Sequence, residues 1–280
     1  MIRIFIAYLL IIPVLIGCDE SIKLDIDQME PKVVIEGLIT NAFKNHYVKV
    51  SFTKEFYQSG STYRIVDAVV VVTDEDNNTY AFTHNPNNHE LLDGYYLSDI
   101  AFAGEVGKEY TLTVTYNGQI FQATDQLLPV TTIDSLGIRL NTDELEDPEV
   151  PGRVFEVLFY AREPQDRIDY YLFKFYRNGA IVHESESDIY FAEDKFLGEN
   201  IDDLPIADFY AIGDTVKVEM YSLSKNGFIY YTDMFNVLNN DGGMFGPIPN
   251  NPRNNISNGA LGYFQTSSVD SETIVVKKPG

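Results

Sequence analysis

Apolar and polar residues alternate with a period of two over much of the chain between residues 33 and 124. In Tyr110–Tyr116 the apolar residues alternate strictly with three threonines, which is typical of a strand with one buried face. The same alternation, or a short apolar run bounded by turn residues, recurs in residues 33–40, 48–53, 68–73, 79–83 and 119–124. Asn117-Gly118 predicts a tight hairpin, and Gly37 predicts a β-bulge. About seven short strands without a helical period predict a β-sandwich over residues 32–128.

A second domain is expected over residues 129–280, because the strand pattern resumes after Leu128-Pro129. Further strands are expected at 153–160, 168–176, 180–184, 214–223, 262–269 and 273–277. The period changes once, where Phe228, Tyr231, Phe235 and Leu238 follow a 3-4-3 spacing that places them on one face of a helix over residues 226–239. We interpret this apolar stripe as the packing face of the helix. The expected fold class is therefore mainly β, with two β-sandwich domains and one substantial helix in the C-terminal domain.

Residues 239–256 form a loop rich in Asn, Gly and Pro that also contains Met244, Phe245 and Ile248. Two interpretations of these apolar residues are open. In the interpretation that we favour, they cap the core of the second domain. In the other, they bind a partner, and the prolines restrict the conformations of the loop before binding. Replacing all three by serine would lower the melting temperature in the first case and abolish partner binding in the second.

The N-terminus has the pattern of a secretory signal. Residues 1–17 contain one positive charge at Arg3, an apolar run over residues 4–16 and the small residue Gly17. The run is shorter than the roughly 20 apolar residues of a membrane-spanning helix. Residues 15–18 (LIGC) resemble a bacterial lipoprotein box, in which Cys18 becomes the lipidated first residue of the mature chain. The alternative is an uncleaved anchor with an incidental cysteine.

Residues 18–31 are acidic, and we expect them to form a tether between the lipid and the first strand. Two or more acyl chains hold a protein on a membrane stably, which would fix the chain there through Cys18. Because Cys18 is the only cysteine, its acylation would leave no thiol for a disulfide or a cysteine-based metal site.

The charge of the chain excludes a basic nucleic-acid-binding surface. Asp and Glu number 42 against 20 Lys and Arg, which gives a formal net charge of −22 and repels phosphate backbones. The 19 Tyr and 18 Phe residues make the chain too apolar for an acidic disordered protein and suit β-sheets.

Several motifs resemble known families. The segments VDAVVV at 66–71, DGYY at 93–96 and GKEYTL at 107–112 are similar to transthyretin-like and carboxypeptidase-regulatory-like sandwiches. Together with the lipoprotein box, VVIEGLIT at 33–40 and NNISNGALGYFQTSSV at 254–269, they make the chain resemble a Bacteroidota lipoprotein family catalogued as domain of unknown function 4249. The resemblance supplies no catalytic residues and implies an accessory role beside an outer-membrane TonB-dependent transporter. The acidic residues after Cys18 are similar to the surface-export signals of such lipoproteins, although a charged tether explains them equally well.

Two groups of residues are candidate metal sites. Asp74, Asp76 and Asn78 alternate as in a calcium loop, but Thr79 and Asn85 do not fit the EF-hand pattern, and a hairpin turn explains these residues. His84 and His89 flank a turn, whereas zinc sites usually need three or four ligands, so we expect solvated loop histidines. No cofactor is expected.

The segment Ser222–Lys225 matches the S-x-x-K pattern of some serine hydrolases, without the companion motifs of those enzymes. Ser224 is also a good helix N-cap, which is the interpretation we favour.

Three functions therefore remain. We expect a non-catalytic, surface-exposed outer-membrane lipoprotein that captures a ligand or assists a transporter. The alternatives are an adhesion or envelope-structural lipoprotein without a soluble ligand, and a weakly marked surface hydrolase.

Overall fold

The computed structural model of the chain describes residues 30–54, 63–89, 92–146, 148–183, 187–196, 200–240 and 250–278. Residues 31–280 form one compact unit. The fold is mainly β with one substantial helix, which confirms the predicted fold class. Cys18, Met244, Phe245 and Ile248 lie outside the described residues, as do the signal and most of the tether, and their assignments stay predictions.

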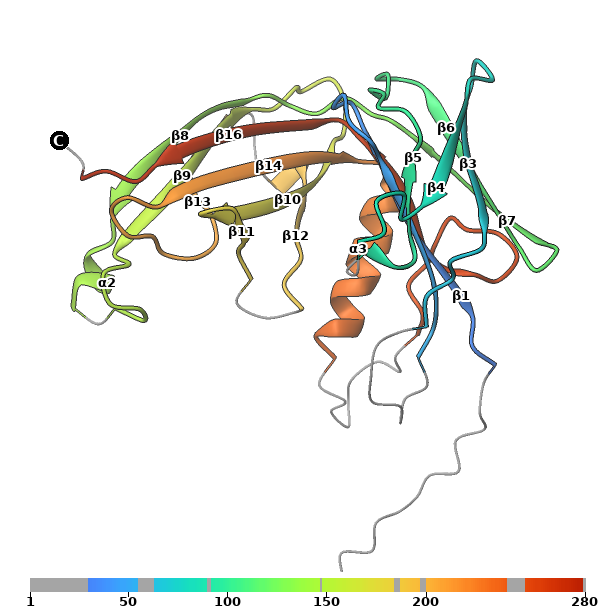
Figure 1. Ribbon diagram of the computed structural model, residues 1–280. Coiled ribbons are helices and arrows are strands. Elements are labelled where there is room, and N and C mark those ends of the chain that lie inside the picture. Colours follow the sequence, from blue (N-terminus) through green and yellow to red (C-terminus); the bar gives the residue numbers. More distant parts are fainter. Residues whose placement is uncertain are drawn as a thin grey trace, which may run out of the picture. The chain divides into compact units, whose positions relative to one another are not determined.

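The first half of the chain forms most of an eight-stranded sheet (Figure 1). Its order is β15-β1-β2-β5-β4-β3-β6-β7, and every neighbouring pair is antiparallel except β1 and β15, which are parallel. The strands are β1 (Val33–Thr40), β2 (Tyr47–Phe52), β3 (Val69–Asp74), β4 (Thr79–His84), β5 (Tyr95–Ser98), β6 (Glu109–Tyr116), β7 (Gln119–Gln126) and β15 (Leu261–Ser267). The six strand ranges expected before residue 128 are confirmed as β1 to β4, β6 and β7, whereas β5 was not assigned a range. The Asn117-Gly118 hairpin between β6 and β7 is also confirmed, with both residues at positive φ.

This sheet curls until its two end strands, β7 and β15, approach each other. The Thr266 amide of β15 donates a 2.9 Å hydrogen bond to Asp125 Oδ2 of β7. Asn255 Nδ2 donates to the carbonyl oxygens of Thr124 at 3.2 Å and Phe264 at 2.8 Å. The two layers around the first core therefore belong to one continuous sheet, and the resemblance to a transthyretin-like sandwich stays a prediction.

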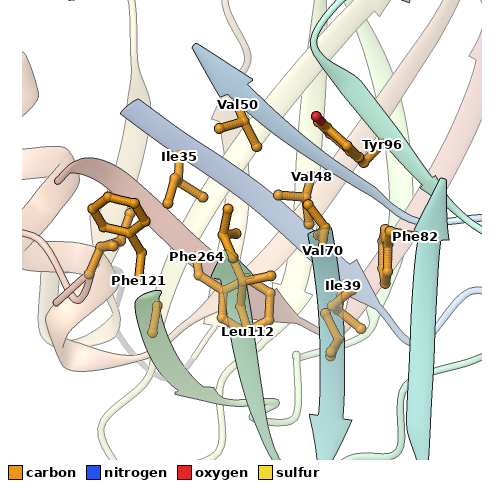
Figure 2. Close-up of a cluster of buried hydrophobic side chains, with 14 of the residues drawn as sticks. Ile35, Ile39, Val48, Val50, Val70, Phe82, Tyr96, Leu112, Phe121 and Phe264 are labelled. Carbon is orange, nitrogen blue, oxygen red and sulfur yellow. The ribbon is translucent and has the colours of Figure 1, made fainter. Parts of the chain in front are cut away.

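The interior of the curled sheet holds the first hydrophobic core. Figure 2 shows side chains from strands far apart in sequence, including Ile35, Val70, Leu112 and Phe264, within this interior. These residues occupy the apolar positions of the period-two pattern, and each is at most 2% exposed.

Gly37 does not form the predicted bulge, because β1 keeps a continuous register with both neighbours. Its partner across the parallel pair is Phe264, and a Cβ atom at Gly37 would lie 2.8 Å from Phe264 Cδ2. Gly262 meets β1 still more closely: it has a φ of +100°, and a Cβ there would lie 2.1 Å from the carbonyl oxygen of Ile35. Both glycines therefore allow the close approach of β15 to β1.

The second core lies between two smaller sheets. One has the order β13-β9-β8, from β8 (Ile133–Leu140), β9 (Phe155–Arg162) and β13 (Asn200–Pro205). The other has the order β11-β10-β14-β16 with β12 also paired to β10, from β10 (Tyr170–Arg177), β11 (Ala180–Ile181), β12 (Tyr190–Glu193), β14 (Thr215–Leu223) and β16 (Val269–Val275). Buried residues of both sheets, such as Val157, Phe159, Val218 and Met220, share this core. The C-terminal half is therefore a two-sheet sandwich.

One strand crosses between the two halves. The sequence pattern assigned residues 262–269 to the C-terminal domain, but β15 pairs with β1 in the sheet of the N-terminal half. The chain then returns through Ser268 into β16, which pairs with β14. A parallel pairing between residues so distant in sequence leaves no local signal, so the pattern could not reveal it. The division near residue 128 stays a prediction.

Helical segments join some of the strands. Besides α2 (Thr142–Glu146) and the 3₁₀ turn η3 (Asp194–Phe196), the structure has α3 (Lys225–Leu238), which matches the predicted helix within one residue. Ser224 is its N-cap and accepts a hydrogen bond from the Gly227 amide at 3.1 Å. Within the described ranges, no helix has the length and apolar character needed to cross a membrane.

Helix α3 contacts β10, β12, β14 and β15, so it covers the region where the large sheet meets the second sandwich (Figure 1). Phe228 packs against Tyr170 with 4.8 Å between ring centroids and against Phe191 with 5.5 Å. The predicted packing face is confirmed at its N-terminal end, whereas Phe235 and Leu238 remain 41% and 44% exposed.

Candidate functional site

A cleft of about 260 Å³ lies between α3, the large sheet and β10. We call it the α3 cleft. It is lined by Glu36, Gly37, Leu38, Tyr47, Lys174, Ile189, Tyr230, Tyr231, Met234, Tyr263 and Gln265.

The floor of the α3 cleft follows from strand geometry. Successive side chains of a strand point to opposite faces, so Ile35 of β1 points into the first core while Glu36 and Leu38 point away from it. Across the parallel pair, Glu36 aligns with Tyr263 and Leu38 with Gln265. The floor is therefore built from the outer face of the large sheet.

Tyrosines of α3 form one wall of the cleft, and their contacts hold them in place. The Tyr230 ring stacks on the Tyr263 ring, with 4.9 Å between centroids and 26° between planes. The Tyr231 hydroxyl donates a 2.7 Å hydrogen bond to Gln265 Oε1. Tyr263 is anchored in turn, because its hydroxyl lies 3.2 Å from the Oγ of the N-cap residue Ser224.

The phenols of the cleft keep their protons at neutral pH. Burial raises the pKa of Tyr47 and of Tyr230 to about 12. Burial also raises the pKa of Tyr231 and Tyr263. The four side chains are therefore neutral, and they present aromatic faces rather than negative charges to a ligand.

Lys174 supplies a positive charge at the side of the cleft. Burial lowers its pKa, although the Glu219 carboxylate opposes this shift. The Lys174 Nζ lies 4.7 Å from the centroid of the Tyr221 ring. None of the described acidic side chains forms an ion pair with Lys174. The other lining charge is already paired, since Glu36 Oε2 lies 2.9 Å from Lys49 Nζ on the neighbouring strand β2.

Three donors of the cleft therefore have no acceptor among the residues that the structure describes: the Lys174 ammonium and the hydroxyls of Tyr47 and Tyr230. An ammonium, free hydroxyls and stacked rings around one small volume can bind a compact ligand that carries hydrogen-bond acceptors and a flat apolar face.

The calcium candidate has the geometry of a hairpin turn. Asp74 Oδ1 accepts hydrogen bonds from the amides of Asp76 at 3.1 Å and Asn78 at 2.8 Å, and Oδ2 accepts one from Asn78 Nδ2 at 2.8 Å. Lys108 Nζ lies 2.8 Å from an oxygen of Asp76. The oxygens that calcium would need are therefore engaged by protein groups.

The first of the histidine candidates, His84, is the last residue of β4. His84 Nε2 accepts a hydrogen bond from the Gly94 amide at 3.0 Å. Over the described parts of the chain, no three His, Cys, Asp or Glu side chains are arranged to hold a metal ion.

The S-x-x-K segment has a structural role. Ser222 is 2% exposed, donates to the Leu128 carbonyl at 2.7 Å and accepts from the Ser268 amide at 2.9 Å. Ser224 caps α3, which confirms the N-cap interpretation.

The sequence pattern does not mark Lys174, Tyr47 or Tyr230 as candidates. The α3 cleft draws its residues from β1, β2, β10, α3 and β15, so no single stretch carries its pattern. One local signal exists: Tyr230 is a large aromatic residue just outside the apolar stripe of α3.

Comparison with protein-family models gives a match over residues 19–273 to the model described as Domain of unknown function (DUF4249). A search of curated proteins gives no match.

Proposed function

Because the chain belongs to the DUF4249 family, which brings no assigned activity with it, we propose a function from its cleft and its N-terminal sequence: a non-catalytic, surface-exposed outer-membrane lipoprotein that captures a ligand for a TonB-dependent transporter.

The observation that carries this proposal is the set of hydrogen-bond donors in the α3 cleft that have no acceptor among the described residues. A buried or half-buried polar group that has no acceptor within the protein gains most from a ligand that supplies one. Lys174, Tyr47 and Tyr230 therefore favour a compact ligand with carboxylate, carbonyl or hydroxyl oxygens. The stacked pair of Tyr230 and Tyr263 adds a flat surface for an apolar face of that ligand.

The membrane location rests on the sequence of residues 1–31. The short apolar run, the lipoprotein box ending at Cys18 and the acidic tether support export, lipidation and attachment to the outer membrane of a Bacteroidota cell. The lipid on Cys18 is the membrane contact in this proposal.

Lipidation is tested by the substitution Cys18→Ala. Cells fed a radioactive fatty acid should label the wild-type chain and leave the variant unlabelled, because the variant lacks the thiol that is acylated. Cys18→Ser keeps a polar side chain of similar size and should also stay unlabelled. It separates the loss of the thiol from the change in side-chain size. Equal label in either variant would exclude Cys18 as the lipid site.

Ligand capture is tested by isothermal titration with a panel of small carboxylates, monosaccharides and oligopeptides. We expect saturable binding by at least one class, and a loss of roughly tenfold or more in Lys174→Met, which removes the ammonium but keeps a long apolar chain. Lys32→Met changes the net charge equally outside the cleft and should bind as the wild type does. The cleft is the wrong site if Lys174→Met binds every active class as tightly as the wild type.

The transporter partnership is tested by purification of the tagged chain from membranes in a mild detergent. An outer-membrane barrel protein should co-purify in stoichiometric amounts. Binding to matrix or to other cells without a barrel partner would support the adhesion function instead, and turnover of a glycan or peptide library would support the hydrolase.

A further inference from the structure

A second, larger cavity opens at the end of the C-terminal sandwich beside α2. Its volume is about 700 Å³, within the range of small-molecule pockets. We call it the α2 pocket; its lining includes Leu140, Leu145, Val154, Phe155, Ile212 and Lys278. It shares no residue with the α3 cleft and was not singled out by the sequence pattern.

The walls of the α2 pocket are held together by hydrogen bonds between its segments. The Asn141 amide donates to the Val154 carbonyl at 2.9 Å, which joins the end of β8 to the start of β9. Phe155 and Tyr210 exchange two backbone hydrogen bonds of 3.1 and 2.8 Å. The Gly213 amide donates to the Val276 carbonyl at 2.9 Å, which brings the segment after β16 beside them. The pocket is therefore largely preformed, so a ligand that enters it loses little free energy to ordering of the protein.

The lining exposes apolar surface to water. Leu140, Leu145 and Ile212 are 39%, 53% and 62% exposed, although each is a large hydrophobic residue that folding normally buries. A hydrocarbon tail in the pocket would remove this surface from water, at about 25 cal/mol per Å².

Lys278 is the charged residue of the lining. None of the described side chains forms an ion pair with it, in a chain whose formal net charge is −22. An ammonium group at the edge of an apolar cavity is complementary to a single negative charge attached to an apolar body. A phosphate monoester carries a charge of about −1.5 to −2 at neutral pH, which is more than one lysine balances, so a singly charged carboxylate fits better.

We propose that the α2 pocket binds a small amphiphile of the fatty-acid class, with its hydrocarbon tail among Leu140, Leu145 and Ile212 and its carboxylate at Lys278. This site goes beyond the proposed capture function and does not rest on it.

The test is a fluorescence titration of the full chain with 11-(dansylamino)undecanoate, without detergent that would compete for the pocket. We expect saturable 1:1 binding with a blue shift of the dansyl emission, because the fluorophore leaves water. The methyl ester of the same probe, which lacks the negative charge, should bind at least roughly fivefold more weakly.

Two pairs of matched variants locate the binding. Lys278→Gln should weaken binding of the carboxylate probe roughly tenfold and leave binding of the ester unchanged. Its control is Lys277→Gln, at the exposed neighbouring residue outside the lining, which should change the binding of neither probe. Ile212→Asp should abolish binding of both probes, whereas Ile100→Asp, at a site 61% exposed in the other half, should not. Circular dichroism and melting temperature establish that each variant is folded.

The proposal is overturned if the carboxylate probe does not saturate at a 1:1 ratio. It is equally overturned if folded Lys278→Gln and Ile212→Asp bind as the wild type does, because the probe would then be held elsewhere, for example by the apolar run at residues 4–16.

Discussion

At the scale of single residues, two buried titratable groups shape the response of the fold to pH. His46 is 1% exposed; its Nε2 bonds to the Phe102 carbonyl at 2.9 Å, and its Nδ1 accepts from the Thr40 amide at 3.4 Å. Burial lowers the pKa of His46 to about 4, although the bond to Phe102 opposes the shift. The neutral ring, with its proton on Nε2, therefore satisfies both contacts.

Acid should destabilise the protein through His46. Its pKa is lower in the folded than in the unfolded chain, so the unfolded state takes up the proton first. The stabilisation is complete above about pH 6.5 and is lost as the pH falls towards 4, by about 3 kcal/mol in total. Urea denaturation of the wild type and of His46→Gln at several pH values measures this. The variant should be less stable at pH 7 but should lack this loss; an equal loss in both proteins would contradict the assignment.

Asp125 has the opposite dependence. It is 7% exposed, and burial raises its pKa to about 6, although the hydrogen bond from the Thr266 amide opposes the shift. The folded state therefore holds its proton more tightly than the unfolded state does. Stability is highest below about pH 4 with respect to this group and is lost as the pH rises through 6.

Asp125→Asn should remove this loss, because the amide keeps an oxygen for the Thr266 N–H but cannot ionise. Relative to the wild type, the variant should gain about 3 kcal/mol in free energy of unfolding between pH 4 and pH 7. The measurement is the difference between the two urea denaturation curves at each pH, in which the contribution of His46 cancels. A difference that stays constant over this range would show that Asp125 is ionised in the folded chain.

At the scale of elements, the sequence predicted strands well wherever one face is buried along the whole strand. The expected strand at 33–40 coincides with β1, and α3 and the turn at Asn117 were also predicted correctly. The sequence pattern did not predict β13 (NIDDLP), which is a polar edge strand with a register shift. It also did not predict β8, in which only the first residue is buried. Local periodicity reflects one-sided burial, so edge strands leave a weak signal.

The candidate sites were less predictable than the strands. Each functional side chain proposed here lies in a cavity formed by segments that are distant in sequence. Lys174 occupies an ordinary position of β10, and Lys278 lies in the segment after β16. Their roles depend on which groups surround them in space.

The close contact of β1 and β15 gives a prediction at this scale. Gly37→Ala places a methyl group against Phe264, which is fully buried and cannot move aside. We expect a loss of about 1–3 kcal/mol, measured by thermal and urea denaturation. Gly118→Ala is the control for the loss of a glycine, because nothing lies within 4 Å of the Cβ atom that it adds. Gly118 has a positive φ, so this control carries a small backbone strain of its own. A destabilisation no larger than that of the control would mean that the sheet accommodates the methyl group.

At the scale of the whole molecule, the two halves are joined by the strand that crosses between them. Phe264 of β15 is part of the first core, and β1 has β15 on one side and β2 on the other. The sheet of the N-terminal half is therefore incomplete without residues from near the end of the chain.

A fragment of residues 31–128 should consequently fail to fold alone. We expect broad, non-cooperative thermal unfolding followed by circular dichroism and little protection in amide hydrogen exchange. The matched control is the chain 31–278, which retains β15 and should unfold cooperatively. A cooperative transition in the short fragment would establish an independent N-terminal domain and the predicted boundary near residue 128.

The same strand order sets the timing of events during synthesis. β1 ends at residue 40 and β15 begins at residue 261, so at ~5–20 residues per second the ribosome needs roughly 10–45 s to supply the missing edge. Until then the edge of β1 that β15 will cover has no partner strand, and an open strand edge is a template for pairing with another chain. A product that ends before residue 261 lacks β15, so its first sheet stays open and it remains a substrate for proteolysis. Closure of the first sheet therefore requires that synthesis has passed residue 267.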